Sequence, residues 1–274
     1  MRYPAVAGTY YPSDKNELKQ QIEKLLADAK EELKNSGRVY RNVSALIVPH
    51  SRLSDSGSVA AAAYATLEVG PYTTFVIIGT DHFGRGGAAS LSREDWITPL
   101  GVVKNDREFA DLIKKESELI DFNEEAHNLE PAVEVQLPFI QTLVKDPKVV
   151  QISVANHTNE VAKDLANAIM KAQKASGRTI VLIGSSDFSA NEPITEAERK
   201  DKLVIKQIEE NEGKAEEFID LVESKDMGIC GPAIITTLMI YAKSNALKAS
   251  LIKRGIFQID SNVTSYAAIV FYSE

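Results

Sequence analysis

The sequence predicts an α/β fold centred on one sheet, and three patterns support this. Apolar, β-branched runs typical of buried strands alternate with helical segments along the whole chain. The run at 74–78, TFVII, is followed by Gly79, a polar turn and further glycines. Two other runs end directly in a histidine, at His50 and His157. Buried strands that open into polar residues are typical of parallel sheets, which present their ligand-binding groups at the carboxyl edge.

The composition is that of a soluble globular protein from a reducing compartment. Of the 274 residues, 44% are hydrophobic and 26% are charged, so a sizeable core can form. The net charge of -8 argues against non-specific nucleic-acid binding. The lone Cys230 excludes an intramolecular disulfide, and no apolar run approaches the roughly 18 residues of a membrane span. We therefore expect a cytoplasmic protein that binds neither nucleic acid nor a membrane.

The N-terminal part is predicted to begin with an irregular segment and a long helix. Residues 2–12 are too rich in proline, glycine and tyrosine for a regular element, yet too apolar for a free tail. We expect them to pack across the domain. Asp14 and Glu17 have the spacing of a capping box, and the apolar stripe that follows ends at Gly37. This pattern predicts an amphipathic surface helix.

Strands and helices then alternate to the C-terminus with one interruption. Residues 88–106, which contain Trp96, are predicted to form a short antiparallel excursion, and Pro138 should bend or restart a helix. No segment has the composition of a linker, so we expect one domain over residues 1–274. The other expected elements are strands at 44–49, 149–156, 179–183, 250–259 and 265–272, and helices at 58–67, 106–118, 159–176, 195–211, 214–223 and 232–241.

Nine side chains are candidates for holding a metal ion. Two imidazoles and a thiolate can bind zinc, copper or ferrous iron and leave a coordination position open. The spacing resembles no compact finger motif, so satisfied core histidines and an inert buried thiol remain alternative interpretations. The candidates are His50, Asp81, His82, His127, Glu130, Glu134, His157, Asp187 and Cys230.

Several of these candidates have more than one interpretation. Cys230 lies at a predicted helix start, which favours a thiolate, although a lone cysteine is more often a small buried apolar residue. Asp187 could cap a helix, orient a histidine or act as a base. Glu130 and Glu134 would share a helix face, where solvent-exposed acids are the commoner explanation. The chain lacks phosphate-loop and GxSxG motifs, so nothing favours nucleotide binding or serine hydrolysis.

Eight short motifs resemble the MEMO family, the mediator of cell motility family, also known as the AmmeMemoRadiSam system protein B group. They occur in the family's order and extend from residue 4 to residue 271, so the chain is identified as a member of that family. The motifs are PAVAGTYYP at 4–12, VPH at 48–50, GTDHFG at 79–84, TPLG at 98–101, EVQLPFIQ at 134–141, SSDFS at 185–189, ICGP at 229–232 and TSYAAIVF at 264–271.

The resemblance implies a fold, a metal site and two kinds of partner. The implied fold is that of the catalytic subunit of class III extradiol dioxygenases, which use non-haem ferrous iron. The implied metal ligands are His50, His82 and Cys230, with Asp187 lining the same pocket. Iron or copper binding and redox activity are implied as well. The resemblance also implies a phosphotyrosine-peptide ligand in animal members and a radical SAM partner protein in microbial ones.

Three segments depart from the family pattern. Where the family usually reads PHAGYxYSG, this chain has PHSRLSDSG at 49–57. Where the family usually reads EHSxEVQLPF and SSDFSH, this chain has Pro131 and Ala190 in place of the two histidines. Imidazole is well suited to proton transfer near neutral pH, so its loss weakens a dioxygenase mechanism more than metal binding. We expect a protein that binds iron or copper, with Asp187 and His127 as the remaining catalytic candidates. The alternatives are an interaction module without catalysis and an active dioxygenase.

Overall fold

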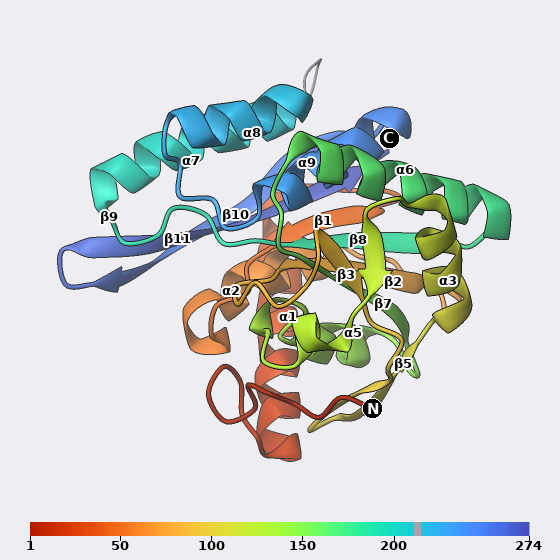
Figure 1. Cartoon of the computed structure of the whole chain (residues 1–274). Helices are drawn as coiled ribbons and strands as arrows, with labels where there is room; N and C mark the ends of the chain where they lie inside the picture. The colour runs from red at the N-terminus through yellow and green to blue at the C-terminus, as the bar shows by residue number, and fades with distance from the viewer. Residues whose placement is uncertain (211–214, 274) are drawn as a thin grey trace.

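The computed structural model describes residues 1–210 and 215–273, and these residues surround one mixed sheet (Figure 1). Eleven strands contribute to the sheet within the described residues. Four parallel strands form its centre, and nearly all of their residues are buried, as expected for a sheet covered on both faces. In spatial order they are β1 (Ala45–Val48), β8 (Ile180–Ser185), β2 (Thr74–Thr80) and β7 (Lys148–Val154).

Further strands extend this parallel centre on both sides. β10 and β11 form a long antiparallel hairpin beside β1, whereas β3 pairs antiparallel with β7. The antiparallel excursion predicted over residues 88–106 is confirmed by β4 and β5, although β5 also pairs in parallel with β7. The bounds are β3 (Ala89–Leu91), β4 (Trp96–Thr98), β5 (Gly101–Asn105), β6 (Ile120–Phe122), β9 (Glu192–Pro193), β10 (Lys248–Ile259) and β11 (Asn262–Tyr272).

Helices cover both faces of the sheet and create two hydrophobic cores (Figure 1). One face carries α3 (Arg107–Glu116), α6 (Asn159–Ser176), α7 (Ile194–Glu210), α8 (Ala215–Ser224) and α9 (Pro232–Ser244). The other carries α1 (Lys15–Ser36), α2 (Leu53–Tyr64), α4 (Pro131–Glu134) and α5 (Leu137–Leu143), and a short 3-10 helix, η1 (Glu124–His127), precedes α4. In the part of the chain that is described, no helix is both long and apolar enough to traverse a bilayer.

Residues of the central strands alternate between these two cores. Val76 and Ile78 belong to the first core, whereas Phe75 and Ile77 belong to the second. This alternation is the period of two that a strand imposes on its side chains. The N-terminal segment adds Val6 and other residues to the second core, which confirms that residues 2–12 pack across the domain.

Helix ends that are marked by capping residues or proline lie where the sequence predicts them. Asp14 accepts hydrogen bonds from the first backbone N–H groups of α1, and Gly37 ends that helix with a φ of 66°. α6 spans the predicted residues 159–176. α5 restarts the chain as a helix with Pro138 in its first turn, as expected.

Several predicted boundaries differ from the structure. β11 begins at Asn262 rather than at residue 265, and α9 ends at Ser244 rather than at residue 241. Two further differences concern β2 and α2. β2 does not break at Gly79 but continues to Thr80, because Gly79 and Thr80 pair with Ser153 and Val154 of β7. A Cβ atom on Gly79 would lie 2.8 Å from the Cβ atom of Ala132, so only glycine allows this close approach. α2 begins at Leu53 rather than at residue 58. The predicted helix end at Asn211 and helix start at Lys214 lie outside the described residues.

Candidate metal centre

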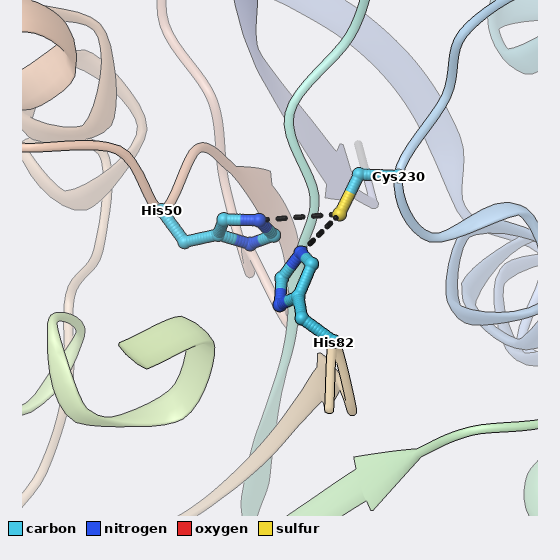
Figure 2. A group of neighbouring side chains, drawn as sticks. All are labelled: His50, His82 and Cys230. Carbon is cyan, nitrogen blue, oxygen red and sulfur yellow. Dashed lines mark hydrogen bonds between the residues drawn. The ribbon is translucent and has the colours of Figure 1, made fainter. Parts of the chain in front are cut away.

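His50, His82 and Cys230 converge beyond the carboxyl ends of the parallel strands (Figure 2). His50 follows β1, His82 follows β2, and Cys230 lies in the loop that leads into α9. The three ligand atoms lie within 4.8 Å of one another. Cys230 Sγ lies 3.2 Å from the Nε2 atom of each histidine, and the two imidazole centroids are 5.1 Å apart. The predicted convergence of these three residues is therefore present in the structure.

A second contact orients each imidazole. His82 Nδ1 lies 2.8 Å from Glu130 Oε1, and the backbone N–H of His82 donates to Glu130 Oε2 at 2.8 Å. His50 Nδ1 lies 3.2 Å from Ser185 Oγ. Because the Ser185 hydroxyl donates to the carbonyl of Ala132, it accepts from His50 Nδ1. Because Nδ1 of each ring is hydrogen-bonded to a neighbouring side chain, Nε2 is the nitrogen that faces Cys230 Sγ. Histidines that bind a metal ion usually have this arrangement.

The spacing of the three atoms fits one transition metal ion after a small expansion. A tetrahedral ion with bonds of about 2.3 Å to sulfur and about 2.1 Å to nitrogen separates those two ligands by about 3.6 Å. The observed separation of 3.2 Å between Cys230 Sγ and each Nε2 is shorter. A shift of a few tenths of an ångström in these side chains would accommodate the ion.

The three ligand groups have pKa values that depend on one another. Burial opposes the thiolate of Cys230, yet the two adjacent histidines outweigh it and lower the pKa of Cys230 to about 6. Hydrogen bonds to Cys230 and Glu130 raise the pKa of His82 to about 10. Burial opposes the charged form of His50, but Cys230 and Asp187 raise its pKa to about 9. Without a metal ion, a thiolate therefore lies between two imidazolium groups at neutral pH, and the thiolate is the metal-binding form of cysteine.

Asp187 holds the loop that carries His50. Its Oδ1 atom accepts the backbone N–H of His50 at 2.8 Å, and its Oδ2 atom accepts the hydroxyl of Ser51 at 2.6 Å. No helix begins at this position among the described residues, so the interpretation of Asp187 as a helix cap is wrong. As expected, Asp187 lines the same cavity as the two histidines.

A cavity of about 420 Å³ opens onto the two histidines. Its polar lining consists of His50, Ser51, His82 and Asp187, and its apolar and aromatic lining consists of Val6, Tyr10, Phe83, Leu129 and Pro131. Phe83 and Leu129 are about half exposed and form the rim. Pro131 has no titratable side chain, so this part of the wall carries no proton-transfer group.

Glu130 and Glu134 are both buried, and the expectation that they are solvent-exposed acids is wrong. Glu130 contacts His82 and accepts the backbone N–H of Ala132 at the start of α4. Glu134 forms an ion pair with Arg2 across 2.6 Å. The local signal is the proline that follows Glu130, because proline is favoured in the first turn of a helix and so marks a helix start.

The other candidate residues lie outside the group of three. His127 is fully buried with its ring 5.5 Å from that of Trp96, and burial together with Arg2 lowers its pKa to about 3. It does not line the cavity, so its expected role in proton transfer remains a prediction without support from its position. Burial and the charge of His82 lower the pKa of His157 to about 4. Asp81 shapes the loop after β2 by accepting two backbone N–H groups.

Three supporting residues were not singled out from the sequence. Ser185 orients His50, and Gln136 Nε2 donates to Ser185 Oγ at 2.9 Å. Thr80 Oγ1 donates to the carbonyl of Cys230 at 3.0 Å. All three lie within motifs that carry the family resemblance, and those motifs were the available signal.

Comparisons with known proteins agree on one family. The family model of the Memo-like protein matches residues 2–270. A MEMO1 family protein of Desulfurococcus amylolyticus is 37% identical and one of Archaeoglobus fulgidus is 33% identical, with 99% of both chains covered in each case. A MEMO1 family protein of Saccharolobus solfataricus is 36% identical over 92% of this chain and 91% of the relative. The chain therefore belongs to the Memo-like protein family.

Proposed function

We propose that this protein binds one redox-capable transition metal ion, iron or copper, through His50, His82 and Cys230. The observation that carries the proposal is the convergence of their ligand atoms within 4.8 Å, with the outer nitrogen of each ring already engaged. Two nitrogens and one thiolate suit borderline and soft metals, whereas magnesium and calcium prefer oxygen ligands. Zinc accepts the same donor set and is the competing metal in any test.

The ion would supply Lewis-acid and redox chemistry at the base of the cavity. Three protein ligands leave a coordination position for an external ligand. The residues around the site have separate tasks: Glu130 holds His82, and Asp187 holds the loop of His50. Phe83 and Leu129 give the rim of the cavity an apolar surface.

The complete donor set favours metal binding over an interaction module that has lost its metal. A module selected only for protein contacts has no need for two imidazoles whose outer nitrogens are held by hydrogen bonds. Here both orienting partners, Glu130 and Ser185, are buried and in place. Such outer partners matter chiefly for metal affinity.

Elemental analysis of anaerobically purified protein tests the proposal. The wild type, reconstituted with ferrous iron or copper(I) and then desalted, should retain close to one ion per chain. His82→Ala should lose most of that metal because it removes one of three ligands. His157→Ala is the matched control, since this histidine also follows a parallel strand but lies outside the group of three, and it should retain the metal. A wild type that retains no transition metal, or a His82→Ala variant that retains as much, would contradict the proposal.

We expect the metal-loaded protein to cleave catechols slowly or not at all. A positioned acid–base group contributes about 10²–10⁴-fold to a rate, and Pro131 and Ala190 replace two such groups. Oxygen uptake with catechol, protocatechuate and dihydroxyphenylalanine after anaerobic loading with ferrous iron should stay well below about one turnover per second. Faster turnover that is abolished by His82→Ala would show that another group, such as Asp187 or His127, transfers the proton.

A further inference from the structure

Residues 1–12, here called the N-terminal strap, are fastened to a buried carboxylate. Glu134 Oε2 accepts the backbone N–H of Ala5 at 2.9 Å, and Oε1 accepts that of Val6 at 3.1 Å. The hydroxyl of Tyr11 donates to the same Oε1 atom at 2.5 Å. Both carboxylate oxygens thus hold the strap, and the Glu134 side chain is inaccessible to solvent.

Arg2 joins this anchor to the turn that carries Glu130. Its Nη1 atom lies 2.6 Å from Glu134 Oε2. Its Nε atom donates to the carbonyl of His127 at 2.7 Å, and Nη2 donates to the carbonyl of Glu130 at 3.2 Å. The guanidinium carbon lies 3.9 Å above the ring of Trp96, and the side chain is only 4% exposed. One buried cation therefore contacts the strap's anchor and both ends of the 127–130 turn.

The N-terminal strap and the 127–130 turn, which Arg2 joins, both contribute to the candidate metal centre. The side chain of Glu130 makes two hydrogen bonds to His82. The strap supplies Val6 and Tyr10 to the wall of the cavity. A planar guanidinium can bond several acceptors in fixed directions at once, so movement of the strap and of the turn is coupled through Arg2.

We propose that Arg2 is a positioning residue of the metal site, which keeps the N-terminal strap on the cavity and Glu130 against His82. The inference rests on the proposed metal binding. Since coupling between two sites is reciprocal, a docked strap should strengthen metal binding, and a bound metal ion should strengthen strap docking by the same factor. A purely structural role for Arg2 would affect stability but neither of these two quantities.

Cobalt(II) titration tests the first half of the proposal. Cobalt bound to a cysteine thiolate has a characteristic charge-transfer absorption, so binding to the full chain can be followed directly. Arg2→Met should weaken cobalt affinity about tenfold, the lower end of the range for residues outside the ligand shell. Arg178→Met is the matched control, because it also removes a largely buried arginine from an ion pair, but at the opposite end of the parallel strands. It should leave cobalt affinity unchanged.

Hydrogen exchange in the wild type tests the second half and needs no variant to fold. The amides of Ala5 and Val6, which donate to Glu134, should exchange about tenfold more slowly with cobalt than without it. The amide of Glu118 also donates to a carboxylate, that of Asp164, and should be unaffected. Unchanged exchange at Ala5 and Val6, or wild-type cobalt affinity in Arg2→Met, would overturn the inference. Absence of the cobalt absorption in the wild type would instead overturn the metal site, and this inference with it.

Discussion

The two ends of the central parallel strands both hold buried charged side chains, but they use them differently. At the amino end of β2, Asp106 accepts a hydrogen bond from Thr74 at 2.7 Å. It also accepts two from the guanidinium of Arg178, each at 3.0 Å. Burial opposes the ionised form of Asp106, yet these hydrogen bonds lower its pKa. At this end the opposite charges bind each other in ion pairs, and these pairs stabilise the fold.

At the carboxyl end of β2, the polar atoms converge on a common point. Glu130 and Ser185 engage the outer nitrogens of His82 and His50, while the inner nitrogens face the sulfur of Cys230. The comparison teaches that burial of charge does not by itself mark a functional site. A candidate site is indicated where donor atoms converge and where hydrogen bonds to the opposite side of each donor group fix its orientation.

Among the substitutions at the two ends of the strands, Cys230→Ser should have the largest effect on metal affinity. Removal of the thiolate should lower affinity for copper(I) and ferrous iron by more than the roughly 10–100-fold typical of residues outside the ligand shell, because soft and borderline metals prefer sulfur to oxygen. Weak magnesium binding, which does not depend on sulfur, should be unchanged. Isothermal titration under anaerobic conditions measures both. Equal copper and iron affinities in wild type and variant would exclude Cys230 as a ligand.

Metal affinity should rise steeply with pH, whereas the Asp106–Arg178 pair should keep both of its charges over the same pH range. The pKa values of His50 and His82 are raised to about 9 and about 10, so both rings are protonated at neutral pH and must release protons to bind metal. Between pH 6 and 9, apparent affinity should increase by up to about 100-fold per pH unit. The pKa of Asp106 is lowered and that of Arg178 is raised, so this pair stays charged throughout. A flat affinity profile from competition titrations would show that the imidazoles are neutral before metal binds.

Glu130→Gln should have an intermediate effect on metal affinity. The variant keeps the size of the side chain but removes the charge that supports His82, and loss of such a partner typically costs about 10–100-fold in affinity. Glu124→Gln is its matched control, because Glu124 also accepts two hydrogen bonds, from Ser92 and Arg93, but contacts neither histidine. Cobalt titration of both variants measures the difference. Similar affinities for the two variants would mean that Glu130 has only a structural role.

Arg178→Met should have the smallest effect on metal binding and a clear effect on stability. Removing the cation leaves Asp106 buried without its charged partner, which should lower the free energy of unfolding by about 2–3 kcal/mol. Metal affinity should stay within about twofold of the wild type, since coupling between distant sites is small unless a two-state element links them. Urea denaturation of the metal-free protein measures stability. A matching loss of metal affinity would break the distinction between the two ends of the sheet.

Features that depend on neighbouring residues were predictable from the sequence. The cap at Asp14, the end of α1 at Gly37 and the bounds of α6 were all correct. Caps, left-handed glycines and apolar periodicity act within one or two turns of backbone, so a short stretch of sequence contains the whole signal. Family motifs extended this to His50, His82 and Cys230, which could be named as candidate metal ligands before their positions were known.

Features that depend on distant partners were decided only by the tertiary structure. From spacing alone, Glu130 and Glu134 were assigned to solvent, yet their partners are His82 and Arg2, which are 48 and 132 residues away. Cys230 is 148 residues from His82 and 180 from His50, and these separations carry no information about distance in space. The pairing of β1 and β2 with β8 places both histidines at one edge, and α9 brings the cysteine to them. The sequence by itself determined which donor atoms are available, whereas the fold determined that they meet, because burial and orientation of a charged group are set by whatever the rest of the chain packs against it.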